Sequence, residues 1–114
     1  MMQEHTLQSA AIDYLNYTVF RDCYFSIPNG AKRTPACAAW MKKEGLRSGI
    51  PDLFIAKPKR GFHGLFIEFK SARGRVSDSQ EKWHKVLEDN DYMIVVIRTI
   101  DDFIRTIEEY AKND

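Results

Sequence analysis

Two short apolar runs of the sequence contain charged residues at positions where burial is expected. Asp52 lies in the run 50–55, and Glu68 and Lys70 lie in the run 65–70. A charge inside a buried strand costs several kcal/mol unless it is paired or binds a metal. Because residues two apart on a strand point to the same face, Glu68 and Lys70 are expected to lie side by side. If the two runs pair as neighbours, Asp52 completes a compact group of two carboxylates and one ammonium.

This combination of residue types suits metal-dependent hydrolysis of a phosphodiester bond. Mg²⁺ prefers oxygen ligands and usually takes one or two carboxylates, which Asp52 and Glu68 would supply. The backbone carbonyl of Phe69 would be a third ligand, and Lys70 would orient or help deprotonate the attacking water. The bound ion would lower the pKa of its water and neutralise charge on the phosphate. The residues alone leave a plainer alternative open, a buried acid–lysine ion pair that only holds two strands together.

The net charge of +1 hides an uneven distribution of charge along the chain. Residues 32–75 contain eleven Lys and Arg against three Asp and Glu, whereas the rest contains six against thirteen. Clustered basic charge is typical of surfaces that bind phosphate backbones, and here it surrounds the acidic candidates in sequence. Lys42 and Lys43 are equally well explained as a solvated helix face. The candidate DNA contacts are Lys32, Arg33, Arg47, Lys57, Lys59, Arg60, Arg73 and Arg75.

Periodicity and capping signals predict one α/β domain over residues 1–114. Thr34 followed by Pro35 predicts a helix start, Gly45 a helix end, and Ser77 with Gln80 a capping box. The apolar, β-branched segment 92–98 is expected to be a central strand. The expected order is helix 4–16, strand 24–27, helix 34–45, the two strands of the apolar runs, helix 77–88, strand 92–98 and helix 100–110.

Several classes of protein are made improbable by what the sequence lacks. The N-terminus shows no signal-peptide pattern, and the most apolar run, residues 92–97, is too short to span a membrane. Cys23 and Cys37 do not suggest a disulfide framework, and Cys37 is expected to be a small buried residue. A cytoplasmic location and no organic cofactor are therefore expected. The three histidines share no zinc-ligand spacing, and His84 is expected to be half exposed. Trp40 is expected in the core or at a partner surface.

Four short motifs follow one another along the chain: Gly45 and Gly49, then Ile50-Pro51-Asp52, then Glu68-Phe69-Lys70, then Gln80 after a basic segment. In this order they resemble the PD-(D/E)XK nuclease superfamily. Within it the chain is most similar to the VRR-NUC domain, a small nuclease domain found alone in phages and at the C-terminus of the Fanconi-anaemia-associated nuclease. Residues 95–98 echo the strand motif that names the domain only loosely. The resemblance covers roughly residues 4–107.

The resemblance implies a restriction-endonuclease-like core, a mixed β-sheet flanked by α-helices. It implies Mg²⁺ or Mn²⁺ as cofactor, held by Asp52, Glu68 and the Phe69 carbonyl, with Glu4 supporting a metal or its water. Lys70 and Gln80 would position the water and the phosphate. Two of these residues keep a structural alternative: Glu4 as a first-turn acid favoured by the helix dipole, and Gln80 as the capping-box partner, a role that does not exclude a place in the site. Gln8, one turn after Glu4, would contact the phosphate or lie exposed.

The substrate expected from the resemblance is branched DNA. Stand-alone VRR-NUC domains resemble structure-selective nucleases that cut four-way junctions as homodimers, and such a chain would act in the host cytoplasm if phage-encoded. Two symmetric cuts need two sites related by a two-fold axis, which a 13.3 kDa unit provides by dimerising. The same chemistry on flaps, single strands or nicked duplex remains open. So does a non-catalytic DNA-binding module, which would keep the basic segments without needing Asp52, Glu68, Lys70 and Gln80 together.

Overall fold

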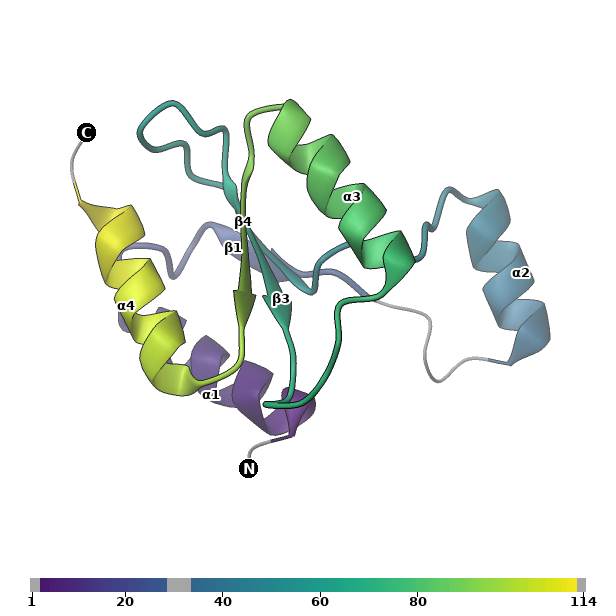
Figure 1. Cartoon of the computed structure of the whole chain (residues 1–114), viewed down its shortest axis with the longest axis horizontal. Helices are drawn as coiled ribbons and strands as arrows, with labels where there is room; N and C mark the ends of the chain where they lie inside the picture. Colours follow the sequence, from purple (N-terminus) through teal and green to yellow (C-terminus); the bar gives the residue numbers. More distant parts are fainter. Residues whose placement is uncertain (1–2, 29–33, 113–114) are drawn as a thin grey trace.

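The order of helices and strands in the structure is the order that the sequence predicts (Figure 1). The computed structural model describes residues 3–28 and 34–112. Each boundary lies within about three residues of its expected place, so local signals were sufficient to find the elements. The elements are α1 (Glu4–Leu15), β1 (Tyr24–Ser26), α2 (Pro35–Lys43), β2 (Leu53–Ile55), β3 (Leu65–Phe69), α3 (Asp78–Asp89), β4 (Met93–Ile97) and α4 (Ile100–Ala111).

The four strands form one mixed sheet in the order β1-β2-β3-β4. The first three strands pair antiparallel, and β3 and β4 pair parallel with α3 as the crossover between them. Leu53 lies opposite Ile67, and Ile55 lies opposite Leu65. This arrangement confirms the expected α/β class with a mixed sheet flanked by helices.

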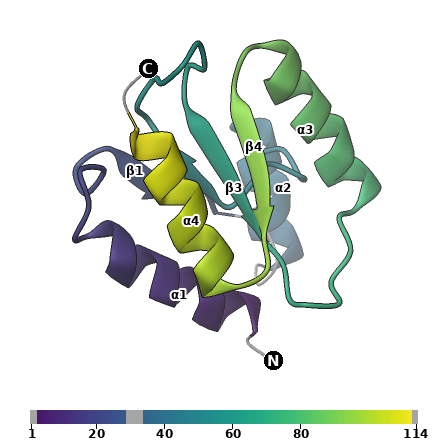
Figure 2. The ribbon, with the colours of Figure 1, turned by 60° about the vertical axis from the view of Figure 1, so that its left-hand side comes forward.

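The hydrophobic core lies between the sheet and the helices α1 and α4, which pack against each other (Figure 2). Alternate residues of β2 and β3 point into this core, and the intervening residues face the other side, where α3 lies (Figure 1). Burial of these side chains is the main stabilisation of the fold. The residues buried in the core are Leu7, Ala11, Leu15, Phe20, Leu53, Ile55, Leu65, Ile67, Phe69, Ile97, Phe103, Ile107 and Tyr110.

One strand differs from its expected place, because β4 is an edge strand among the described strands. Its apolar, β-branched composition suggested a central strand, yet Val96 is 36% exposed. A strand that pairs parallel on one side and contacts helices needs apolar residues whether or not its other side is paired. The apolar composition of β4 therefore indicates that helices pack against the strand, but it does not indicate whether the strand is central or at an edge of the sheet.

Helix α2 stands apart from the rest of the fold (Figure 1) and contacts no other described helix or strand. The expected burial of Cys37 is wrong, because this cysteine is exposed. Trp40 is 65% exposed, so it lies outside the core. Its expected place at a partner surface stays a prediction. The helix forms as predicted, with Thr34 Oγ1 accepting from Cys37 N at 3.2 Å, but none of its residues is buried. None of the described helices is long and apolar enough to cross a membrane.

Candidate active site

The register of β2 and β3 places Asp52 beside Glu68. Leu53 pairs with Ile67, so extending that register by one residue puts the two acids opposite each other on the face away from the core. Both side chains are buried, with 8% of Asp52 and 1% of Glu68 exposed. The Asp52 backbone is fixed on both sides, since its N–H donates to Ile67 O at 3.0 Å and its carbonyl accepts from Ile27 N at 2.8 Å.

The backbone of Phe69 lies next to the Asp52 carboxylate. Phe69 N donates to Asp52 Oδ2 at 2.8 Å in a buried hydrogen bond. The N–H and C=O of one residue in a strand point to the same side, so the Phe69 carbonyl also faces the Asp52 side. The next residue turns the other way, with Lys70 N donating to Ile97 O at 2.9 Å on the β4 side. A carbonyl oxygen and two carboxylates therefore converge at this end of the strands.

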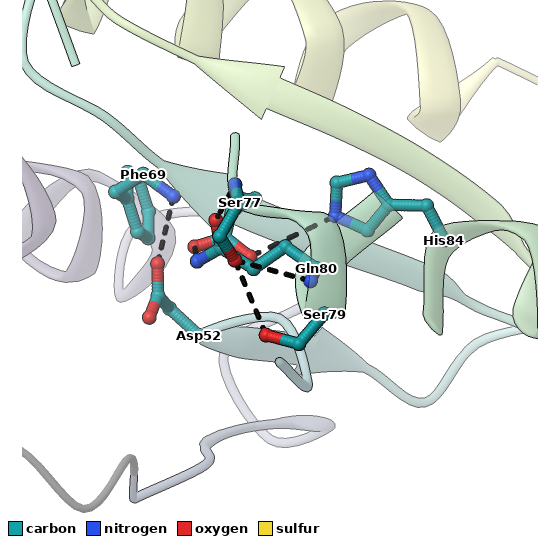
Figure 3. A network of polar contacts seen from close by, with 7 residues as sticks. Asp52, Phe69, Ser77, Ser79, Gln80 and His84 are labelled. Atoms are coloured by element: carbon teal, nitrogen blue, oxygen red, sulfur yellow. Dashed lines mark hydrogen bonds and ion pairs between the residues drawn. The ribbon is translucent and has the colours of Figure 1, made fainter. Parts of the chain in front are cut away.

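Gln80 belongs to the helix cap and to the acidic site at once (Figure 3). Its Oε1 accepts from Ser77 N at 2.8 Å, and its backbone N donates to Ser77 Oγ at 3.2 Å, which completes the predicted capping box. Its Nε2 donates to Glu68 Oε2 at 3.1 Å. The cap and a contact with Glu68 are therefore compatible, because the amide uses its oxygen for the cap and its nitrogen for the carboxylate.

Gly49 brings the Gly-x-Pro-Asp segment into contact with the start of α3. A Cβ added at Gly49 would lie 2.5 Å from Ser79 O and 3.0 Å from Gln80 N, and the backbone has φ +92°. Both the close approach and the left-handed conformation require glycine. This contact sets the distance between the Asp52 segment and the turn that carries Gln80.

His84 is a member of the site that the sequence analysis missed. The side chain is 14% exposed, contrary to the expected half exposure, and its Nε2 lies 3.7 Å from Glu68 Oε1 (Figure 3). The missed signal was its spacing, because four residues after Gln80 on a helix means the same face. Burial is the largest cause that lowers the pKa of His84, and the positive charge of Lys70 lowers it further. The nearby Glu88 and Glu81 oppose this by raising it.

The electrostatics of Glu68 reflect two acids held together in a poorly solvated place. Burial, the largest cause, raises the pKa of Glu68 to about 8, and the neighbouring charge of Asp52 and a side-chain hydrogen bond with Asp52 add to this. Lys70 lowers the pKa of Glu68, and Glu4, the smallest of the causes, raises it. Lys70 and Glu4 are thus close enough to act on Glu68 through their charge, and Glu4 is exposed.

The residues present fit a divalent cation. No hydrogen bond of normal geometry from the described residues reaches the buried Glu68 Oε1. Two adjacent buried carboxylates and an oxygen left without a donor are what a hard cation stabilises. Within the described ranges no group of three His, Cys, Asp or Glu side chains can hold a metal. The available donors are therefore Asp52, Glu68 and the Phe69 carbonyl, with water and phosphate oxygens to complete the shell.

The segment after β3 carries two of the candidate DNA contacts and is held by Arg98. Arg98, directly after β4, donates from Nη1 to Ser71 O at 2.7 Å and to Gly74 O at 2.6 Å. These bonds fix the backbone around Arg73, which is exposed, as is Arg75. The segment follows directly after Lys70, so both arginines lie at the same end of the sheet as the acids.

The loop 56–64, which carries the candidate DNA contacts Lys57, Lys59 and Arg60, lies at the end of the strands away from the acids. It joins the Ile55 and Leu65 ends of β2 and β3, opposite the ends that carry Asp52 and Glu68. Its basic residues contact the end of α4 instead: Lys59 Nζ donates to Ala111 O at 3.4 Å, Arg60 pairs with Glu109, and the Lys57 carbonyl accepts from Tyr110.

The other candidate DNA contacts fall in three different places. Arg47 is exposed between α2 and the Gly49 turn, in the segment that leads to Asp52. Gln8 is partly buried and lines a cavity of about 460 Å³ with Ser26 and other residues of α1 and β1. Lys32 and Arg33 lie outside the described residues.

Comparison with known proteins agrees with this geometry. The sequence model of the VRR-NUC domain matches residues 7–100. A solved structure described as a VRR_NUC domain protein is similar to this chain, with 26% sequence identity and a TM-score of 0.86 over 100% of this chain and 93% of that one. A comparison with curated proteins gives no match. Because the matched region holds all the motifs from Gln8 to Arg98, the chain belongs to the VRR-NUC family of PD-(D/E)XK-type, nuclease-like domains.

Proposed function

We propose that this protein is a divalent-metal-dependent endonuclease that hydrolyses phosphodiester bonds of DNA. The observation that carries the proposal is the buried pair of Asp52 and Glu68 beside the Phe69 carbonyl, with a lysine following directly. Membership of the VRR-NUC family gives the nuclease class. A purely structural ion pair explains the geometry less well, because burial and Asp52 raise the pKa of Glu68 despite the charge of Lys70.

In the proposed mechanism the chain supplies positioned oxygens and one ammonium. Asp52, Glu68 and the Phe69 carbonyl would hold Mg²⁺ or Mn²⁺, which when bound supplies positive charge at the phosphate and acidifies water. Lys70 would orient the attacking water and stabilise the negative charge that develops on the phosphate. The water oxygen forms a bond to phosphorus as one of its protons passes to solvent, and the ester bond to one sugar oxygen breaks, with that oxygen taking up a proton from solvent. Gln80 would keep Glu68 in place during these steps, and Glu4 would hold outer water.

We propose that the DNA runs along the end of the sheet where the acids lie. Arg73 and Arg75 leave the site on the segment that Arg98 fixes, and Arg47 precedes it on the Gly49 side. Gln8, which lines the cavity beside α1, would contact the DNA strand from there. Lys57, Lys59 and Arg60, at the far end of the strands, would reach only a distant arm of a branched substrate.

A four-way junction cut by a homodimer is the substrate and assembly that we propose. Helix α2 presents exposed apolar residues, Trp40 among them, without a neighbour within the described chain, which suits a surface covered by a second copy. Sedimentation at micromolar concentration, with and without DNA, should give a dimer of 13.3 kDa units. A monomer under both conditions would remove the homodimer from the proposal.

The substrate is tested by a panel of labelled DNAs in Mg²⁺, Mn²⁺ or EDTA. The panel contains a four-way junction, a flap, single strand, nicked duplex and linear duplex, each also incubated with Asp52→Ala. Paired, metal-dependent cuts on the junction that the variant does not make are the expected result. Cuts on another member would keep the nuclease and change its substrate. Binding without cleavage of any member would make a non-catalytic DNA-binding module the better account.

A further inference from the structure

The Glu68 carboxylate is approached by two side chains from consecutive turns of α3. Gln80 Nε2 donates to one oxygen, Oε2, at 3.1 Å. His84 Nε2 lies 3.7 Å from the other oxygen, Oε1 (Figure 3). Residues four apart on a helix share a face, so both side chains reach the sheet at the same place.

His84 Nε2 and Glu68 Oε1 are both buried, and neither atom has a hydrogen-bond partner among the described residues. A buried polar atom without a partner costs about 1–3 kcal/mol, so two such atoms facing each other are more stable once they bond. The 3.7 Å separation is just beyond hydrogen-bond range, and a movement of about 1 Å closes it. A neutral imidazole has the single N–H donor that this contact needs.

We propose that His84 is a positioning residue, whose Nε2–H donates to Glu68 Oε1 and, together with Gln80, fixes the Glu68 carboxylate toward a bound divalent cation. This inference rests on the proposed metal-dependent function. Two donors on two oxygens define the plane of a carboxylate, which one donor leaves free to turn. Removal of a residue that hydrogen-bonds a metal ligand commonly lowers metal affinity about 10–100-fold.

A direct role as a metal ligand fits the geometry less well. Among the described residues, no three His, Cys, Asp or Glu side chains are close enough together to share one metal, so His84 does not form a ligand set with Asp52 and Glu68. In Figure 3, His84 and Asp52 lie on opposite sides of the polar network. Mg²⁺ also prefers oxygen to imidazole nitrogen.

Metal affinity in the absence of DNA tests the proposal without relying on activity. Mn²⁺ titrations at constant pH would compare the wild-type chain with His84→Gln, which keeps an N–H donor near the same position, and His84→Leu, which does not. His63→Leu, in the loop at the far end of the sheet, is the matched control. Thermal unfolding in EDTA reports whether each variant is folded.

The expected result is Mn²⁺ affinity lowered about 10–100-fold in His84→Leu, near wild type in His84→Gln and unchanged in His63→Leu. Wild-type affinity in a folded His84→Leu, or an equal loss in both His84 variants, overturns the inference and leaves the nuclease proposal standing. A wild-type chain that binds no Mn²⁺ overturns both.

A second test uses only the wild-type chain and asks which ring nitrogen of His84 carries the proton. Long-range ¹H–¹⁵N spectra of the ¹⁵N-histidine-labelled wild-type chain with saturating Mg²⁺ distinguish protonated from unprotonated ring nitrogens. The proposal expects a proton on Nε2 of His84. An unprotonated Nε2 facing Glu68 overturns it.

Discussion

Gln80 Nε2 donates to Glu68 Oε2 at 3.1 Å while Gln80 Oε1 accepts from Ser77 N at 2.8 Å. One amide thus links the first turn of α3 to the buried carboxylate on β3. The helix start and the acidic site are therefore held in one arrangement, and a change at either end is expected to reach the other.

Two substitutions distinguish the contact of Gln80 with Glu68 from its contribution to the helix cap. Ser77→Ala removes the capping hydroxyl and is expected to cost about 1 kcal/mol of stability with little change in Mg²⁺ affinity. Gln80→Ala also frees Glu68 Oε2, so we expect a similar loss of stability and Mg²⁺ binding at least about tenfold weaker. Urea unfolding and calorimetric titration measure the two quantities. Equal Mg²⁺ affinities in the two variants would show that Gln80 serves the cap alone.

Gly49 is expected to tolerate substitution far less than Gly45. Both glycines have positive φ, so alanine at either should cost about 1–3 kcal/mol in backbone strain. Of the two, only Gly49 has backbone close to the added Cβ, with Ser79 O at 2.5 Å, whereas no atom of the described residues lies within 4 Å of a Cβ added at Gly45. Gly49→Ala should therefore lose about 1–3 kcal/mol more and displace Gln80 from Glu68. Urea unfolding of both variants measures the difference, and equal losses would contradict the close packing.

The raised pKa of Glu68 predicts how stability depends on pH in the metal-free protein. The pKa is about 8 in the folded chain against an ordinary value of 4.5, so between these values the folded state binds more protons than the unfolded state. Stability in EDTA should therefore fall as pH rises from 5 to 8, by an amount on the order of a few kcal/mol. Glu68→Gln removes the titrating group and should flatten this slope. Chemical unfolding in EDTA across the pH range measures both, and identical slopes would contradict the shift.

Arg98 is expected to affect DNA binding through the backbone that it holds. Arg98→Met removes the bonds to Ser71 O and Gly74 O, so the segment carrying Arg73 loses its support. DNA binding in EDTA should weaken about three- to tenfold, roughly 1 kcal/mol, while Mg²⁺ affinity stays near wild type. Arg105→Ala, an exposed change on α4, is the control. Wild-type DNA affinity in Arg98→Met would assign the two bonds a purely structural role.

The features that could be predicted from the sequence are those determined by residues close together in the chain. The Thr34 and Ser77 caps, the two apolar runs and the eight elements depend on neighbours in the chain, and the paired register of Asp52 and Glu68 followed once those runs were taken as adjacent strands. Family motifs supplied the nuclease class.

What the sequence missed depends on long-range packing. Nothing local shows that the loop 56–64 folds onto α4, at the end of the sheet away from the acids. The exposure of Cys37 follows from α2 lacking a neighbour, and the edge position of β4 follows from strand order. His84 was within reach, since its spacing from Gln80 placed it on the site-facing side of α3.

The central claim is that Asp52 and Glu68 form a metal-dependent hydrolytic site, and single-turnover cleavage by Asp52→Asn tests it most directly. This variant keeps a side-chain oxygen able to accept from Phe69 N, so the fold should persist, as thermal unfolding would verify. With the best substrate of the panel, we expect Mg²⁺-dependent cleavage by the wild-type chain, none in EDTA, and a rate in the variant lower by at least about 100-fold, or roughly 3 kcal/mol. DNA binding should be retained or tighter, because one negative charge facing the phosphate is lost. Cleavage by a folded Asp52→Asn at the wild-type rate, or cleavage that persists in EDTA, would contradict the account.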